Sequence, residues 1–130
     1  MSIEVIRCAN TPASPLPFSP AIRAGDFVFV SGQASVDESG KIVVDSFEEE
    51  FRRSLENVRK ILMAAGLGFQ NVVQVRSYLG SQEDVAQYNQ LYLEYFSEPY
   101  PARSTSVGVL GTMLKFELDV TAYAGKSSIQ

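Results

Sequence analysis

The stretch SFEEEFRRSLENVRKILMAAG, residues 46–66, predicts a long amphipathic helix. Ser46 and Glu49 have the spacing of a capping box, in which each side chain accepts a hydrogen bond from the other residue's backbone N–H. Apolar side chains then recur at intervals of three or four, as on the buried face of a helix. They are Phe47, Phe51, Leu55, Val58, Leu62 and Ala65. Gly66 can end this helix in the left-handed conformation.

Before this helix, the sequence indicates two short strands. The apolar run 27–30 stands between Gly25-Asp26 and Ser31-Gly32, which is typical of a strand buried on both faces. Residues 37–40 resemble a turn, and residues 41–44 would then complete a hairpin. Further upstream, residues 10–20 contain four prolines and are predicted to form an irregular arm, because proline removes backbone donors.

After the helix, residues 72–79 predict a strand with Val73, Val75 and Leu79 on its buried face, because apolar and polar side chains alternate there. A second helix is expected from Ser81 until Pro99 stops it. Two strands, 104–109 and 115–123, would follow, joined in a tight hairpin at Gly111-Thr112.

The order of these elements predicts an α+β fold, with two helices on one face of a single sheet. In the last strand, Phe116, Leu118 and their alternate neighbours would face the helices, while Glu117, Asp119 and Thr121 would face away. The second face is only partly polar and needs a cover. Self-association in a closed symmetric oligomer would provide that cover.

Length and composition exclude several classes of protein. A chain of 130 residues has the size of one domain, and we expect a single domain over residues 1–130. Histidine is absent and Cys8 is the only cysteine, which excludes histidine-based catalytic triads and internal disulfides. The net charge of −4 has the wrong sign for binding to nucleic acid backbones. No apolar run could cross a bilayer, so a cytoplasmic protein is expected.

Several residues could carry chemistry, each with a plainer alternative. Arg103 follows Pro101-Ala102 and could clamp a small anion, although it could equally pair with an acidic neighbour on the surface. Glu117 and Asp119 would share one face of a strand, as an acid–base pair or as ordinary surface charges. Ser31-Gly32 would let a ligand approach the backbone, but a turn requires the same residues.

The sequence from about Pro15 to Ala124 resembles the Rid family, also called the YjgF-type proteins, which are reactive-intermediate imine deaminases. The resemblance rests on the order and spacing of several short pieces. These are Gly25-Asp26, Ser31-Gly32-Gln33, Leu55, Asn57, Leu62, Ala65-Gly66, Asn89, Tyr92, Phe96, Pro101-Ala102-Arg103-Ser104 and Glu117.

The resemblance implies a chorismate-mutase-like fold with a single sheet of about six strands and two helices packed on one face. It also implies a homotrimer with a cleft at each subunit interface. The expected activity is hydrolysis of 2-imino acids, such as 2-iminobutanoate and 2-iminopropanoate, to 2-keto acids and ammonia. The resemblance implies that no metal or organic cofactor takes part.

The resemblance also assigns roles to individual residues. Arg103 would hold the substrate carboxylate, and Glu117 would position the attacking water or move its proton. Five residues would line the cleft: Phe18, Ser31, Gly32, Asn89 and Thr105.

Two of these positions depart from the family's deaminase branch, which usually has tyrosine where Phe18 stands and cysteine where Thr105 stands. The loss of one phenolic hydroxyl would make the cleft more apolar. Two alternatives to imine hydrolysis stay open. One is a noncatalytic trimer that binds small carboxylates or a partner protein, and the other is an endoribonuclease, which the negative charge disfavours.

Overall fold

Helix α1, Phe47–Ala64, forms as its sequence predicts. The Ser46 side chain accepts a hydrogen bond from the Glu49 backbone N–H at 3.2 Å, and Gly66 has a φ of +78°, so both ends of the helix are confirmed. The predicted stripe is buried against the sheet from Phe47 to Leu62, and its last member, Ala65, is partly buried. This computed structural model describes residues 3–9 and 15–125, so part of the predicted proline-rich arm, residues 10–14, lies outside the described residues.

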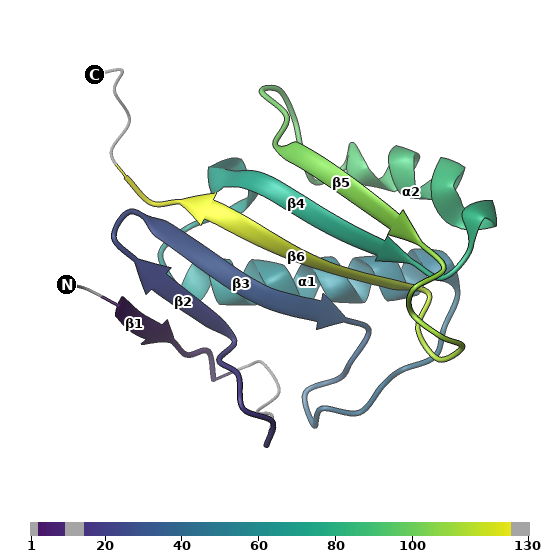
Figure 1. Cartoon of the computed structure of the whole chain (residues 1–130), viewed down its shortest axis with the longest axis horizontal. Coiled ribbons are helices and arrows are strands. Elements are labelled where there is room, and N and C mark those ends of the chain that lie inside the picture. The colour runs from purple at the N-terminus through teal and green to yellow at the C-terminus, as the bar shows by residue number, and fades with distance from the viewer. Residues whose placement is uncertain (1–2, 10–14, 126–130) are drawn as a thin grey trace.

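The helices pack on one face of a six-stranded sheet, whose strands lie in the order β1-β2-β3-β6-β4-β5 (Figure 1). The strands are β1 (Ile3–Ile6), β2 (Ala21–Ala24), β3 (Phe27–Ala34), β4 (Val72–Leu79), β5 (Ala102–Val107) and β6 (Phe116–Tyr123). The remaining helices are α2 (Val85–Tyr92) and two short 3-10 helices, η1 (Phe69–Asn71) and η2 (Gln82–Asp84). The predicted α+β class and the arrangement of two helices against one sheet are therefore confirmed.

One predicted hairpin forms only in part, and the other is wrong. The chain reverses at the predicted turn, where the Gly40 N–H donates to the Asp37 carbonyl, but residues 41–44 form no regular strand and only an isolated antiparallel bridge joins Val36 and Ile42. Strand β5 does not pair with β6 across Gly111-Thr112, because β4 lies between them and pairs in parallel with β5. Turn residues signal where the chain reverses, but they do not decide which strand becomes the neighbour.

The burial of two strands also differs from expectation. Val28 and Val30 of β3 are buried, but Phe29 is 48% exposed, so this strand has one buried face in the chain rather than two. In β4 the pairing with β6 shifts register between Val72 and Gln74. This irregularity places Val72 in the core and leaves Val73 43% exposed, whereas simple alternation predicted Val73 inside.

The core between sheet and helices is rich in aromatic rings. Phe51 of α1 lies with its ring centroid 4.8 Å from that of Phe116 and 6.2 Å from that of Tyr88. Such tilted and edge-on contacts add to the stabilisation from burial. This packing fixes α1, α2 and the start of β6 relative to one another, and Glu117 follows Phe116 directly.

Among the described residues, no helix combines the length and the apolar character that crossing a membrane requires.

Candidate functional site

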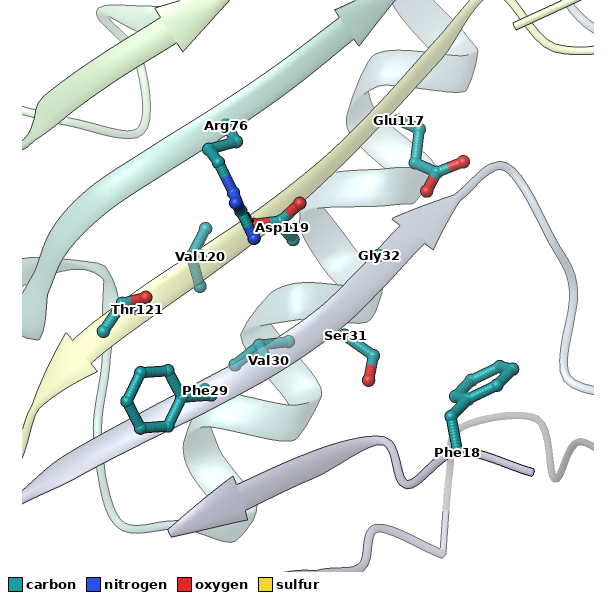
Figure 2. A pocket seen from close by; sticks show the side chains of 10 residues that line it. All are labelled: Phe18, Phe29, Val30, Ser31, Gly32, Arg76, Glu117, Asp119, Val120 and Thr121. Atoms are coloured by element: carbon teal, nitrogen blue, oxygen red, sulfur yellow. Dashed lines mark hydrogen bonds and ion pairs between the residues drawn. The ribbon is translucent and has the colours of Figure 1, made fainter. Parts of the chain in front are cut away.

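The sheet face opposite the helices carries a pocket of about 400 Å³. Residues of β3, β4 and β6, together with Phe18 from the preceding loop, line this pocket (Figure 2). The lining residues are Phe18, Phe29, Val30, Ser31, Gly32, Arg76, Glu117, Asp119, Val120 and Thr121. Glu117 and Phe18 lie at one end, and Phe29 and Thr121 lie at the other (Figure 2).

A bulge in β3 shapes the floor of this pocket. Val30 pairs with Val120 and Gln33 pairs with Leu118, so β3 advances by three residues while β6 advances by two. The extra residue falls at Ser31-Gly32. Bulges of this kind redirect side chains and are common beside active sites.

The Glu117 carboxylate lies directly over Gly32 (Figure 2). A Cβ atom added at Gly32 would overlap Glu117 Oε2 and would lie 3.3 Å from its Cδ. Glycine therefore leaves the space that the carboxylate occupies. No positive φ is involved at this position, so the requirement for glycine comes from the close approach of Glu117 alone.

Glu117 is free to act on a ligand, because its carboxylate makes no hydrogen bond or ion pair with any described residue. Burial raises the pKa of the Glu117 carboxyl above its ordinary value, and the negative charge of Asp119 raises it further. A carboxylate with a raised pKa binds a proton more readily. Glu117 is thereby suited to accept a proton from a water molecule and to return it.

Asp119 has a different environment, although it shares the open face with Glu117. Its Oδ1 accepts a hydrogen bond from Arg76 Nε at 2.8 Å, and its Oδ2 accepts one from the Tyr78 hydroxyl at 2.8 Å. Both oxygens of Asp119 are therefore engaged. Of the two carboxylates that the sequence left as a possible acid–base pair, the structure leaves only Glu117 without such partners.

Ser31 lines the pocket, but its hydroxyl group already has a partner. Its Oγ donates to the Ser19 carbonyl at 2.5 Å, and its backbone N–H donates to the Pro20 carbonyl at 2.9 Å. These two bonds attach the loop that carries Phe18 to strand β3. Phe18 itself is 54% exposed at the pocket.

Arg103 lies on the other face of the sheet. Val75 of β4 pairs with both Arg103 and Val120, and Val75 and Val120 are buried beneath the helices. Directly paired residues share a face, so Arg103 faces α2. Glu117 pairs with Tyr78 on the open face. One strand lies between β5 and β6, so the backbones of Arg103 and Glu117 are about 10 Å apart in the plane of the sheet. Their side chains also point to opposite faces of the sheet.

The Arg103 guanidinium stacks on two tyrosines of α2, with its Cζ 5.0 Å from the ring centroid of Tyr88 and 4.8 Å from that of Tyr92. It makes no hydrogen bond or ion pair with a described residue, so its donors remain available. Thr105 lies two residues further along β5 on the same face, and its Oγ1 is 3.4 Å from Tyr88 Oη. Asn89 follows Tyr88 on α2 and is exposed.

The predicted site residues therefore form two groups within one chain. Phe18, Ser31, Gly32 and Glu117 meet in the pocket, while Arg103 and Thr105 lie beside α2 at the edge strand, and Asn89 is on α2 itself. Sequence reasoning missed Arg76 and Phe29 in the pocket. The sequence did carry one signal for Arg76. It stands between Val75 and Ser77 on the alternating strand, so it faces away from the helices, as Glu117 does.

This arrangement defines a small α+β protein with a carboxylate in an open sheet-face pocket and a separate arginine at the sheet edge. The sequence profile described as endoribonuclease L-PSP matches residues 8–124. A RutC family protein of Pyrococcus horikoshii is 39% identical over 122 residues, which cover 92% of this chain and 97% of that protein. The chain belongs to this family, the Rid/YjgF/RutC family.

Two further relatives have more specific names. The human protein named 2-iminobutanoate/2-iminopropanoate deaminase is 33% identical over 124 residues, which cover 94% of this chain and 90% of that protein. The crystal structure of E. coli TdcF with bound serine superposes with a TM-score of 0.82 at 30% identity, over 94% of this chain and 99% of that one. The fold expected from the resemblance is thus confirmed, and a relative binds a small amino acid.

Proposed function

We propose that this protein hydrolyses reactive 2-imino acids to 2-keto acids and ammonia, in clefts between the subunits of a homotrimer. One observation carries the proposal: Glu117 lies in an open pocket, has a raised pKa and has no hydrogen-bond or ion-pair partner among the described residues, while both oxygens of its neighbour Asp119 accept hydrogen bonds. Family membership and the deaminase names of its relatives support the choice of substrate.

The reaction follows from the chemistry of a protonated imine, whose carbon is already strongly electrophilic. Glu117 accepts a proton from water as the water oxygen bonds to the imine carbon and the C=N electron pair moves to nitrogen. Glu117 then returns the proton to that nitrogen. The C–N bond then breaks as the C=O bond forms, and ammonia leaves. Ammonia takes up the proton of the former hydroxyl group and departs as ammonium. Orientation of substrate and water supplies most of the acceleration.

Arg103 would bind the substrate carboxylate, since guanidinium matches a carboxylate with two parallel hydrogen bonds. It cannot do so beside Glu117 of its own chain, because the two residues face opposite sides of the sheet. A second subunit that places its edge strand β5 over the open face of the first would bring them together. The site is therefore proposed to be shared between two subunits, with the exposed β5 as one of its walls.

The activity test couples the protein to a dehydratase that releases an enamine, with semicarbazide as a competing trap. Wild type should accelerate keto-acid formation, while Arg103→Ala and Glu117→Gln should each lower this acceleration at least about 100-fold. The proposal would be refuted if wild type left the rate of keto-acid formation unchanged. It would also be refuted if Arg103→Ala accelerated keto-acid formation as much as wild type does. Keto-acid binding without turnover would instead support the noncatalytic alternative.

Subunit sharing has a separate test, in which the two inactive variants are unfolded together and refolded at equal amounts. Each interface of a random trimer needs Arg103 from one chain and Glu117 from the next, so about one quarter of the interfaces should be restored. The mixture should then recover about a quarter of the wild-type rate. Recovery of none would place both residues in one chain's site and contradict the shared cleft.

The description of the matching family favours endoribonuclease as a second candidate. The chain has no histidine and a net charge of −4, and the pocket holds two carboxylates against one arginine. Such a pocket repels a phosphate backbone. Cleavage of a labelled RNA that persists after repurification, and persists in Glu117→Gln, would support this candidate.

A further inference from the structure

Tyr88 connects the two predicted ligand-facing residues of strand β5. Its side chain is fully buried, and its ring lies under the Arg103 guanidinium, 5.0 Å from Cζ. Its hydroxyl donates to Ser77 Oγ at 2.8 Å and lies 3.4 Å from Thr105 Oγ1. Because the Tyr88 proton goes to Ser77, Thr105 is the donor in the longer contact.

Tyr92 supplies a second ring for the same guanidinium. Its centroid is 4.8 Å from Arg103 Cζ, and the two tyrosine rings lie 5.8 Å apart at an interplanar angle of 66°. The guanidinium is thus held by two aromatic faces at different angles. Since these faces attract a cation without using its N–H groups, the donors of Arg103 stay free for a ligand.

We infer that this tyrosine pair, Tyr88 and Tyr92, positions the carboxylate-binding side of the site. The two rings orient Arg103, and the Tyr88 hydroxyl orients Thr105 through a contact backed by the buried Ser77. The expected effect on KM rests on the proposed function, whereas the orientation of Arg103 and Thr105 by the two tyrosines does not. In this arrangement the Thr105 hydroxyl group forms its hydrogen bond with Tyr88 and not with the substrate.

A spectroscopic test needs no activity. In the folded wild type, the Arg103 side-chain N–H resonance should be shifted by the two ring currents, and the Thr105 methyl resonance should report its surroundings. Tyr88→Leu and Tyr92→Leu should each move the Arg103 resonance toward its ordinary position. Tyr88→Phe should keep the Arg103 resonance and move only that of Thr105. Unchanged Arg103 resonances in both leucine variants would overturn the inference.

The kinetic test separates positioning from general stability. An arginine that grips the substrate equally in ground and transition states acts on KM, so each leucine variant should raise KM about tenfold with a smaller change in kcat. Tyr95→Leu is the matched control, since its ring packs on Phe51 and Phe69 and its hydroxyl accepts from Arg52, away from Arg103. It should leave KM unchanged.

The possible outcomes separate the proposed function from the positioning role of the two tyrosines. If wild type neither turns over imines nor binds a keto acid while the resonances shift as expected, the proposed function fails and the positioning role stands. If wild type is active and both leucine variants keep the wild-type KM, the positioning role fails and the proposed function stands. If Tyr88→Leu does not fold, Tyr92→Leu and Tyr88→Phe decide the ring and hydroxyl roles respectively.

Discussion

The close approach of Glu117 to Gly32 makes Gly32→Ala a sensitive probe of the site. The added methyl group would overlap Glu117 Oε2, so the carboxylate has to move to restore ordinary contact. The flexible glutamate side chain can yield at little cost in stability, and Gly32 has no positive φ that alanine would strain. A displacement of about 1 Å at a catalytic group costs on the order of 100-fold in rate.

We therefore expect Gly32→Ala to lower kcat about 100-fold while its urea unfolding midpoint stays near that of wild type. The coupled dehydratase assay measures the rate. A double-mutant cycle with Glu117→Gln isolates the cause, because a methyl group that acts only by displacing Glu117 should have no further effect once that carboxylate is gone. Equal rate losses from Gly32→Ala in the wild-type and Glu117→Gln backgrounds would refute the reasoning. A Gly32→Ala variant that keeps the wild-type kcat would refute it as well.

Three variants test further predictions about charge and capping. Glu117→Gln should remove the acidic limb of the pH–rate profile and lower kcat about 10²–10⁴-fold. The same variant should melt at a higher temperature than wild type at pH 7, because the raised pKa of Glu117 makes its ionised form unfavourable in the fold. As the pH falls through the raised pKa, Glu117 becomes protonated and this destabilisation of wild type disappears, so the two melting temperatures should converge below the ordinary glutamate pKa of 4.5. Glu50→Ala should lower the free energy of unfolding in urea by about 2–4 kcal/mol, because the backbone N–H groups of Asp45 and Lys115 would lose their acceptor. The Lys115 ammonium, which also donates to Glu50, is 41% exposed and would stay solvated. A loss under about 1 kcal/mol would contradict this expectation. Ser46→Ala should cost about 1 kcal/mol through loss of the α1 cap, and an unchanged urea midpoint would show that the cap contributes nothing.

Local signals predicted those parts of the fold whose cause is local. The cap at Ser46 and the apolar stripe of α1 depend on residues a few positions apart, and the faces of β6 follow from strict alternation. The four-residue strands β1 and β2 carry too little pattern to be detected. The register shift beside Val73 adds a residue that alternation cannot show in advance.

The candidate site was predicted as a set of residues but not as a geometry. The residues around the β3 bulge and Glu117 do meet in one pocket. Arg103 lies on the opposite face because the register of β5 on β4 pairs it with the buried Val75, and that register depends on the whole chain rather than on the sequence near Arg103. The tyrosines beneath Arg103 resembled ordinary core residues, since a ring that supports a guanidinium has the same helical spacing as one that fills space.

The placement of Arg103 and Glu117 on opposite faces has a consequence for how the proposed activity responds to protein concentration. In the proposed trimer, an isolated subunit would contribute Arg103 to one site and Glu117 to another, and would hold no complete site of its own. Specific activity should consequently fall when the protein is diluted to the point where subunits separate, and it should return on reconcentration. Assembly would then set the amount of working catalyst without any change in the fold of the individual chain.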